Sequence, residues 1–455
     1  MSVGIEYPSH NVFVLNDGVT FSSNFDNGNL ANCEASYGQF NYKLWVAPDN
    51  YKSEYKINKH SGHFHFVVSG VPGGTTLKMT FQNVSPHQSL YKFDMRPVYK
   101  CKATNNKWTR LRHPVQFEKV DDVGNLTIEH IVDISNDQVW FCFTYPYSYE
   151  MVQQDMRVID AHPLNFSDPE AIYCTRELLI NSCDGRRVDL VTISAMEGID
   201  PRGNREEIPP QCFPEELPGA DISVYGQRGG GDASAAGTHA VGSAAASTID
   251  SSSTAGGAGA PSPPSKISKK KSKNKFDSSI LENATSRRAF NFPNKEIVWV
   301  SGRVHPGEVP AQHTMKGILD FLMHPTDARA KELRRRYVFK VVPMINPDGV
   351  FRGHFRMDQF HQNLNRYYVN PDIAFQPAIF AIKSLLDLYA LRMEKLAVYL
   401  DLHAHASKRG CFIYGKLCSL SCGYVLPVLY YYLLLCFIVI IITLISFVID
   451  YVISF

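Results

Sequence analysis

The stretch that decides the fold is Val298-Trp-Val-Ser-Gly-Arg-Val-His-Pro-Gly-Glu308, an apolar run that ends in a short polar loop. Its β-branched and aromatic residues favour a buried strand. The loop carries His305 and Glu308 three residues apart, so both side chains can face one point. Catalytic zinc is commonly held by two histidines and a carboxylate, with a fourth position left open. The pair therefore predicts two ligands of a metal site, which needs one more histidine.

A similar stretch near the other end of the informative sequence supplies that histidine. Leu396-Ala-Val-Tyr-Leu-Asp-Leu-His403 is again an apolar run with a histidine at its carboxyl end. Parallel sheets usually carry their chemistry at the carboxyl ends of their strands. We therefore expect His305, Glu308 and His403 to hold one metal ion.

Helical and strand-like patterns alternate between these two stretches. Apolar residues at helical spacing predict a helix over 310–323, with a proline suited to its first turn. A buried strand is predicted over 337–346, and it ends in Asn346-Pro-Asp-Gly349, which is typical of a turn. A second helix is predicted over 377–393. Strands alternating with helices indicate an α/β domain with a mainly parallel or mixed sheet.

The preceding part of the chain has a different pattern. Residues 1–165 carry short β-rich runs separated by turn residues, which indicates an all-β sandwich domain. His63 and His65 alternate in one such run, but no third ligand lies nearby in sequence, so we expect them to pack or to lie at the surface. Two apolar runs flank Asp184-Gly185, a strong hairpin signal. This hairpin belongs to the second domain, which we expect over 166–415.

Composition narrows the possible partners. The chain has 455 residues and 44% of them are apolar, which is ordinary for a globular protein of two or three domains. A formal net charge of +2 creates no strong field of one sign, so neither nucleic acid nor a membrane surface is expected as the main partner. The 10 cysteines are scattered, and the first residues lack the basic and apolar regions of a signal peptide. A reducing, cytosolic environment fits both features.

The α/β domain is expected to carry a disordered, low-complexity insertion. From about residue 201 to 285 the chain is rich in Gly, Ser, Ala and Pro, and such a segment cannot bury enough apolar surface to offset the entropy of ordering. A basic run, Lys266-Ile-Ser-Lys-Lys-Lys-Ser-Lys-Asn-Lys275, lies near its end. We favour the interpretation that this run is a solvated part of the insertion. The alternative is a patch that binds an acidic partner or serves nuclear import.

Several motifs occur in an order and spacing that point to one family. In chain order they are His305-Pro-Gly-Glu308, Asn346-Pro-Asp-Gly349, Arg352-Gly-His-Phe-Arg356, Asn363-Leu-Asn-Arg366 and Asp401-Leu-His403. Together they resemble the zinc metallocarboxypeptidases, and in particular the cytosolic carboxypeptidase branch, whose members trim glutamates from tubulin and other acidic tails. The resemblance covers roughly residues 12–200 and 290–415. It implies a carboxypeptidase-like α/β/α sheet preceded by the all-β domain.

The resemblance assigns roles to the metal loop and to one arginine. His305, Glu308 and His403 would hold one Zn²⁺ ion, which makes water a usable nucleophile at neutral pH and polarises the scissile carbonyl. Arg356 matches the family arginine that stabilises the oxyanion of the tetrahedral intermediate. It is the one catalytic side chain that the resemblance adds to the metal ligands.

Further positions match residues that bind the substrate or orient the metal ligands. Asn365 and Arg366 match the pair that grips the free carboxylate of the substrate, for which a planar guanidinium is suited. Asn363 stands where many relatives have an aspartate that orients a zinc histidine, and its amide oxygen can accept the imidazole N–H. His405 is expected behind the ligands or at the surface. Arg352, together with Lys408 and Arg409, is a candidate for a basic rim.

The family pattern stops after Gly415. Relatives use a glutamate on a later strand as general base, whereas the last glutamate here is Glu394. Glu332 and Glu394 lie in charge-mixed helical segments that are typical of a surface. The resemblance therefore implies a truncated catalytic domain with weak or absent activity.

Residues 416–455 form an apolar tail. Its run over 425–448 is long enough for a bilayer-spanning helix, and the basic residues before it would keep the amino-terminal part in the cytosol. Alternatively the tail derives from mis-spliced or non-coding sequence, which we favour because an interrupted α/β sheet would expose apolar edges.

The resemblance thus implies a zinc-dependent metallocarboxypeptidase that removes chain-end or branch-point glutamates from tubulin and other acidic tails. The alternative is a catalytically impaired product that binds acidic carboxyl-terminal tails, anchored to a membrane if 425–448 inserts. We expect a cytoplasmic location, with association with microtubules, and the nucleus as a second compartment. No nucleic-acid partner is expected.

Overall fold

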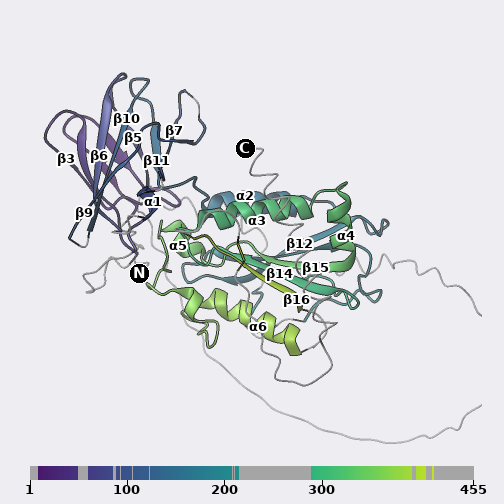
Figure 1. Ribbon diagram of the computed structural model, residues 1–455. Coiled ribbons are helices and arrows are strands. Elements are labelled where there is room, and N and C mark those ends of the chain that lie inside the picture. Colours follow the sequence, from purple (N-terminus) through teal and green to yellow (C-terminus); the bar gives the residue numbers. More distant parts are fainter. Residues whose placement is uncertain are drawn as a thin grey trace, which may run out of the picture. The chain divides into compact units, whose positions relative to one another are not determined.

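The architecture is taken from a computed structural model of the chain (Figure 1). The structure describes residues 9–49, 60–85, 89–92, 94–104, 106–121, 123–207, 209, 211–214, 288–391, 396–405 and 412–413. Most of the expected insertion, Lys408, Arg409, Glu394 and the apolar tail 416–455 lie outside these ranges. Within them, no helix combines the length and the apolar composition that a membrane span requires.

The amino-terminal part folds into two β-sheets. The first consists, in order across the sheet, of β1 (Val12–Val14), β2 (Thr20–Ser22), β5 (His65–Ser69), β11 (Val139–Cys142), β7 (Val98–Cys101) and β8 (Thr109–Arg110). The second consists of β3 (Asn32–Ala35), β4 (Asn41–Trp45), β6 (Thr76–Val84), β10 (Val123–Ile131) and β9 (Gln116–Val120). All paired neighbours in these two sheets run antiparallel except β4 and β6. A short helix, α1 (Ser89–Lys92), follows β6.

Aromatic side chains fill the space between the two sheets. Phe64 stacks on Phe81 with 4.3 Å between ring centroids, and Phe66 stacks on Phe141 at 5.6 Å. All four rings are fully buried, as expected where alternate residues of facing strands meet in a sandwich core. The predicted all-β domain is therefore confirmed. His63 and His65 are also buried, so they pack inside this domain.

The sheet of the α/β part is mixed. Across it lie β12 (Ile172–Asn181), β13 (Arg187–Ala195), β15 (Tyr337–Val342), β14 (Glu296–Gly302) and β16 (Leu396–Leu402). The first three pair antiparallel, whereas β14 runs parallel to both β15 and β16. The helices of this part are α2 (Tyr149–Asp160), α3 (Val309–Leu322), α4 (Ala328–Arg336), α5 (Pro347–Phe351), the 3-10 turn η3 (Leu364–Arg366) and α6 (Pro377–Leu391). The predicted α/β domain is confirmed.

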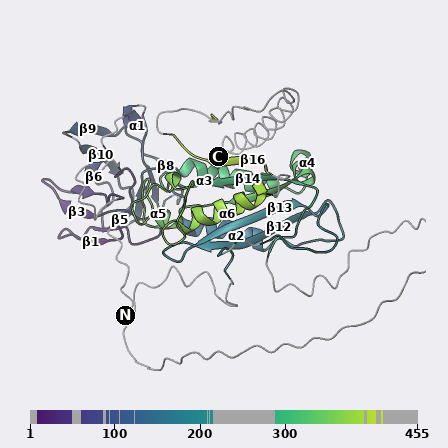
Figure 2. The ribbon, with the colours of Figure 1, turned by 90° about the horizontal axis from the view of Figure 1, so that it is seen from below.

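The strands of this sheet are apolar on both faces because helices cover both. On β14, Val298 and Val300 pack in the cluster that contains α2, α3 and α4, while Ile297 and Trp299 pack in the cluster that contains α6. Figure 1 shows α2 and α3 along one face and α6 along the other, and Figure 2 shows α6 from the side that it covers. The helices predicted at 310–323 and 377–393 correspond to α3 and α6.

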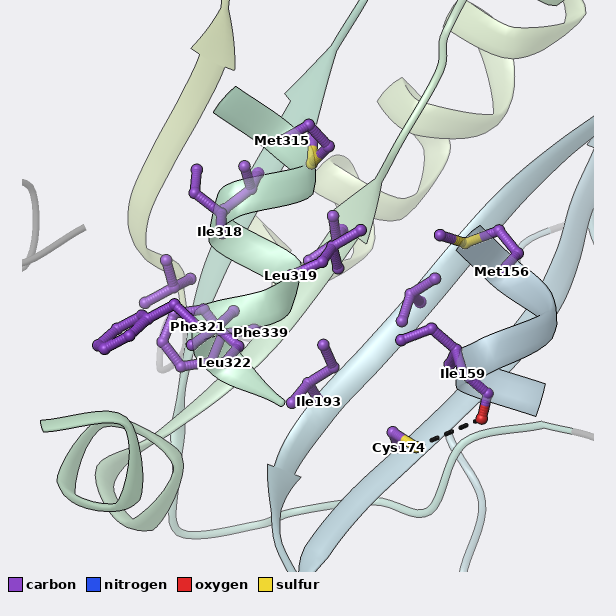
Figure 3. Packing of buried hydrophobic residues seen from close by; sticks show 14 of the residues in the cluster. Met156, Ile159, Cys174, Ile193, Met315, Ile318, Leu319, Phe321, Leu322 and Phe339 are labelled. Atoms are coloured by element: carbon purple, nitrogen blue, oxygen red, sulfur yellow. Dashed lines mark hydrogen bonds between the residues drawn. The ribbon is translucent and has the colours of Figure 1, made fainter. Parts of the chain in front are cut away.

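Figure 3 shows the layer in which α2 and α3 pack on the sheet. Met156 and Ile159 of α2 share one buried cluster with Met315 of α3 and Ile193 of β13. The Cys174 thiol on β12 donates to the Ile159 carbonyl at 3.7 Å. Helix α2 lies within 1–165, the range expected for the first domain, and yet its buried side chains pack on the α/β sheet.

Two predicted turns had different outcomes. Asp184-Gly185 does join β12 to β13, and Gly185 has the positive φ of 80° that such a turn favours. The turn predicted at Asn346-Pro-Asp-Gly349 is instead the start of helix α5. Asn346 caps this helix because its side chain accepts the Gly349 N–H at 2.9 Å, and the proline that follows suits a first helical turn.

Candidate metal centre

Parallel pairing of β14 and β16 brings the two predicted histidine loops together. Gly302, the last residue of β14, pairs with Leu402, the last residue of β16. Both chains therefore leave the sheet at the same edge, β14 towards His305 and β16 towards His403. The ring centroids of the two histidines are 5.1 Å apart.

Buried contacts hold the loop between β14 and α3 in shape. Arg303 is 1% exposed, and its guanidinium donates to the carbonyls of Pro306 at 2.7 Å and Tyr147 at 3.1 Å. The Gly307 N–H donates to the Phe355 carbonyl at 2.7 Å. A Cβ at Gly307 would lie 2.6 Å from that same oxygen, so no other residue fits without movement. This loop is therefore defined by its backbone contacts.

The three predicted ligands converge. His305 Nδ1 lies 2.8 Å from Glu308 Oε1, and His403 Nδ1 lies 3.0 Å from Glu308 Oε2. One ligand atom from each side chain lies within 4.8 Å of the other two. Two imidazole nitrogens and one carboxylate form the donor set that zinc accepts, so the residues fit a bound metal ion.

The outer nitrogen of each imidazole faces an acceptor. His305 Nε2 lies 3.0 Å from Asn363 Oδ1, which also accepts the Asn365 N–H at 3.2 Å. His403 Nε2 lies 2.8 Å from Asp401 Oδ2. Such outer contacts select the tautomer that leaves Nδ1 free for a metal. Asp401 was not predicted as a site residue, although its position two residues before His403 on a strand places both side chains on one face.

The charges of this group interact strongly. Burial alone would raise the pKa of Glu308, but hydrogen bonds from His305, His403 and the Ala404 N–H outweigh it and hold that pKa at about 2. Hydrogen bonds to Asp401 and then to Glu308 raise the pKa of His403 to about 10. The two carboxylates thus favour a positive charge at this point, which a bound cation would supply.

The remaining predicted residues lie around this group at different distances. The guanidinium of Arg356 is 4.0 Å from Glu308 Oε1, and its side chain is 32% exposed. Asn365 and Arg366 form the η3 turn that begins directly after Asn363. Arg366 is exposed and donates to the Asn365 carbonyl at 3.1 Å. Among the described residues, no hydrogen bond or ion pair joins Arg366 to Arg356 or to the three ligand candidates.

Three other predictions concern residues farther from the metal group. Arg352 does not offer a basic rim, because its guanidinium binds both carboxylate oxygens of Asp184 at 2.9 Å. Glu332 pairs with Arg335 and Arg336 on the exposed side of α4, as expected for a surface residue. His405 is exposed and its ring lies against Phe412.

Sequence comparison identifies the class of protein. Residues 266–374 match the zinc carboxypeptidase family, and residues 21–144 match the cytosolic carboxypeptidase N-terminal domain. The chain belongs to the zinc carboxypeptidase family, in its cytosolic carboxypeptidase branch.

Similar proteins agree with that placement. The chain is 31% identical to human cytosolic carboxypeptidase-like protein 5 over 398 residues, which cover 81% of this chain and 37% of that protein. It is 32% identical to the Danio rerio protein of the same name over 390 residues, covering 80% and 36% respectively. The chain therefore spans little more than a third of the length of these relatives. A metallo-carboxypeptidase from Burkholderia cenocepacia shares the fold, with a TM-score of 0.52 and 19% identity over 86% of this chain and 71% of that chain.

Proposed function

We propose that this chain is a zinc-dependent carboxypeptidase that removes glutamates from the ends or branch points of acidic protein tails, such as those of tubulin. The observation that carries the proposal is the convergence of His305, Glu308 and His403, with an acceptor behind each imidazole and Arg356 beside the carboxylate. The cytosolic branch and the tubulin substrate are supported by the resemblance to the family. We propose the cytosol as the location, with microtubules as a place of action.

Each residue contributes a distinct step to this chemistry. His305, Glu308 and His403 would hold one zinc ion. Zinc bound there supplies a Lewis acid and makes water nucleophilic at neutral pH. Asn363 and Asp401 keep the imidazoles oriented by accepting their outer N–H groups. Arg356 supplies a fixed positive charge, which stabilises negative charge as it develops on the carbonyl oxygen of the substrate.

Asn365 and Arg366 would recognise the end of the substrate. The exposed guanidinium of Arg366 can donate two parallel hydrogen bonds to a free carboxylate, and the Asn365 amide can donate a third. An internal peptide has no such carboxylate, so cleavage is restricted to chain ends. We propose that this pair, and not the metal group, distinguishes a free terminus from an amidated one.

Among the described residues, no carboxylate other than Glu308 and Asp401 contacts the metal group, so none is placed to act as general base. The test therefore measures zinc content, peptide binding and glutamate release separately. The zinc-loaded full chain should bind a peptide ending in glutamates much more tightly than the same peptide with an amidated end. Arg366→Ala should abolish this preference. Glutamate release by this chain should be slow, and Arg356→Ala should lower it further. Lys383→Ala, which removes an exposed charge on α6, is the control.

Two results would overturn the proposal. One is a chain that holds no zinc, or that holds the same amount after His305→Ala. The other is equal affinity for the free and the amidated peptide in the zinc-loaded protein.

A further inference from the structure

The end of α5 and the residues that follow it are hydrogen-bonded to the β-sandwich. A helix leaves its last carbonyls without partners inside the helix, and here four consecutive carbonyls of residues 350–353 accept from sandwich donors. The donors and acceptors are Asn27 Nδ2 to Val350 (2.8 Å), Asn27 N–H to Phe351 (2.9 Å), Ser9 Oγ to Arg352 (2.8 Å) and Asn29 Nδ2 to Gly353 (2.9 Å). The approach is close, since a Cβ at Gly353 would lie 2.5 Å from the Gly28 carbonyl.

Asp49 of the sandwich holds residues 355–357. It is 1% exposed, and its Oδ1 accepts the Phe355 N–H at 2.7 Å. Its Oδ2 accepts the N–H groups of Arg356 at 2.6 Å and Met357 at 2.9 Å. The same segment returns to Asp49 through His361, whose Nδ1 donates to the Asp49 carbonyl. One carboxylate from the sandwich therefore binds the backbone of the arginine that faces the metal group.

Phe355 extends this contact to the metal loop. Its carbonyl accepts the N–H of Gly307, which lies between His305 and Glu308 in the sequence. Its ring packs with the sandwich core, with the centroid 6.0 Å from that of Phe143. Asp49, the peptide group between Phe355 and Arg356, and Gly307 thus form a continuous line of hydrogen bonds from the sandwich to the loop that carries His305 and Glu308.

From this line we infer that Asp49 is a positioning residue of the catalytic site, which sets the place of Arg356 and of the His305–Glu308 loop. The inference rests on the proposed function. It gives the sandwich a defined part in the chemistry, because Asp49 acts through the backbone of Arg356 and of the metal loop. No side chain of the sandwich needs to touch the substrate for this effect.

The chemistry of the contact explains why an aspartate is needed. Burial raises the pKa of Asp49 to about 6, and the three N–H groups act against this rise, so the carboxylate is ionised at neutral pH. A buried carboxylate is stable only while all its hydrogen bonds are made, and charged acceptors make the stronger ones. Asparagine has the same shape but turns one acceptor into a donor that faces an N–H group.

The experiment compares Asp49→Asn with Asp26→Asn in the full chain. Asp26 is a matched control, because it is another sandwich aspartate whose carboxylate accepts a backbone N–H of the α/β part, that of Glu150 at 2.7 Å. Its partner lies on α2, and its charge also acts on Arg303 of the metal loop, so only the segment 355–361 separates the two variants. The first readout is amide hydrogen exchange of the segments 303–309 and 355–361. We expect Asp49→Asn to speed exchange in both segments by tenfold or more, and Asp26→Asn to leave 355–361 unchanged.

The second readout is binding of a phosphinic analogue of a glutamate-ended peptide to the cobalt-loaded protein. Asp49→Asn should weaken binding at least tenfold and shift the visible cobalt bands, and in the Arg356→Ala background it should weaken binding less than twofold further. If Asp49→Asn does not fold, Asp49→Ser, which keeps one acceptor oxygen, replaces it with the same expected result.

The outcomes separate the two proposals. Wild-type protein that binds neither cobalt nor the analogue contradicts the proposed function. Wild-type protein that binds both overturns the positioning role alone if Asp49→Asn and Asp26→Asn have equal effects on 355–361, or if the effects of Asp49→Asn and Arg356→Ala are additive.

Discussion

The two imidazoles of the metal centre are oriented by acceptors of different charge. Behind His305 stands the neutral amide of Asn363, whereas behind His403 stands the carboxylate of Asp401, which also accepts the Ser301 hydroxyl at 3.1 Å. A charged acceptor makes the stronger hydrogen bond and raises the basicity of the ligand more than a neutral one. The two sides of the site should therefore contribute unequally to metal affinity.

Replacement of each acceptor tests this difference. Asp401→Ala should weaken zinc binding by about 10 to 100-fold, because the His403 ring loses the acceptor that fixes its tautomer. Asn363→Ala should weaken binding less than Asp401→Ala does. Competition with a coloured chelator measures both affinities, and Asp387→Ala, an exposed residue of α6, is the control. Equal affinities in Asp401→Ala and wild type would show that this contact does not support the metal.

His130, inside the sandwich, makes stability depend on pH. Its ring is 7% exposed and lies against Tyr99 and Phe141, and burial lowers its pKa from 6.5 to about 4. Between pH 4 and pH 6.5 the unfolded chain binds a proton at His130 more readily than the folded protein does. The free energy of unfolding is therefore highest above pH 6.5 and falls as the pH drops towards 4. At pH 5 the loss amounts to about 2 kcal/mol.

His130→Phe keeps the aromatic volume and removes the titrating group. Relative to wild type, the variant should gain about 2 kcal/mol in free energy of unfolding between pH 7.5 and pH 5. Urea denaturation of both proteins at both pH values measures this difference. A difference between variant and wild type that is the same at the two pH values would contradict the prediction.

For single residues, the sequence predicts the metal ligands better than the residues that orient or position them. His305, Glu308 and His403 could be named because each follows an apolar run at the carboxyl end of a strand. Asp401 carried a weaker signal, since only strand periodicity relates it to His403. Asp49 carried none, because Pro48-Asp49 looks like an ordinary surface turn and its partners lie about 300 residues later in the chain.

At the scale of elements, hydrophobic periodicity predicted α3, α6 and the β12–β13 hairpin because these are defined by local patterns. Helix α5 was missed because its five residues are too short to show a helical period. A capping asparagine followed by proline has the composition of a turn. What decides between turn and helix is Asn346, which is 2% exposed and donates through Nδ2 to the Val304 carbonyl at 3.2 Å.

Two helix caps in this chain allow that buried contact to be measured. Asp327 caps α4 by accepting the N–H groups of Arg329 and Ala330, and Asp327→Ala should cost about 1 kcal/mol in free energy of unfolding. Asn346→Ala should cost about 2 to 3 kcal/mol, because it leaves the buried Gly349 N–H and Val304 carbonyl without this partner. Chemical denaturation gives both values. A cost for Asn346→Ala no larger than that for Asp327→Ala would show that burial of the cap adds nothing.

At the scale of the whole molecule, the described sandwich and α/β parts should unfold together. The contacts of Asp49, Asn27 and Asn29 bury polar groups of the α/β part against the sandwich, and these groups would lose their partners if one part unfolded alone. The sequence predicted two domains because their patterns differ, but it contains no signal for the contacts between them. Such contacts join residues whose distance along the chain is large and whose local pattern is ordinary.

The four tryptophans of the chain make joint unfolding measurable. Trp45, Trp108 and Trp140 lie in the sandwich, whereas Trp299 is fully buried on β14. A variant with phenylalanine at the three sandwich positions reports on the α/β part through Trp299, and Trp299→Phe reports on the sandwich. In each variant, tryptophan fluorescence and circular dichroism should give the same denaturation midpoint. Zinc at 100 times its dissociation constant should raise the stability seen by both reporters by about 2.7 kcal/mol, because a ligand that binds only the folded state stabilises the entire cooperative unit. If zinc moves the Trp299 transition and leaves the sandwich transition in place, the two parts are independent, and the hydrogen bonds of Asp49 do not couple the sandwich to the metal centre.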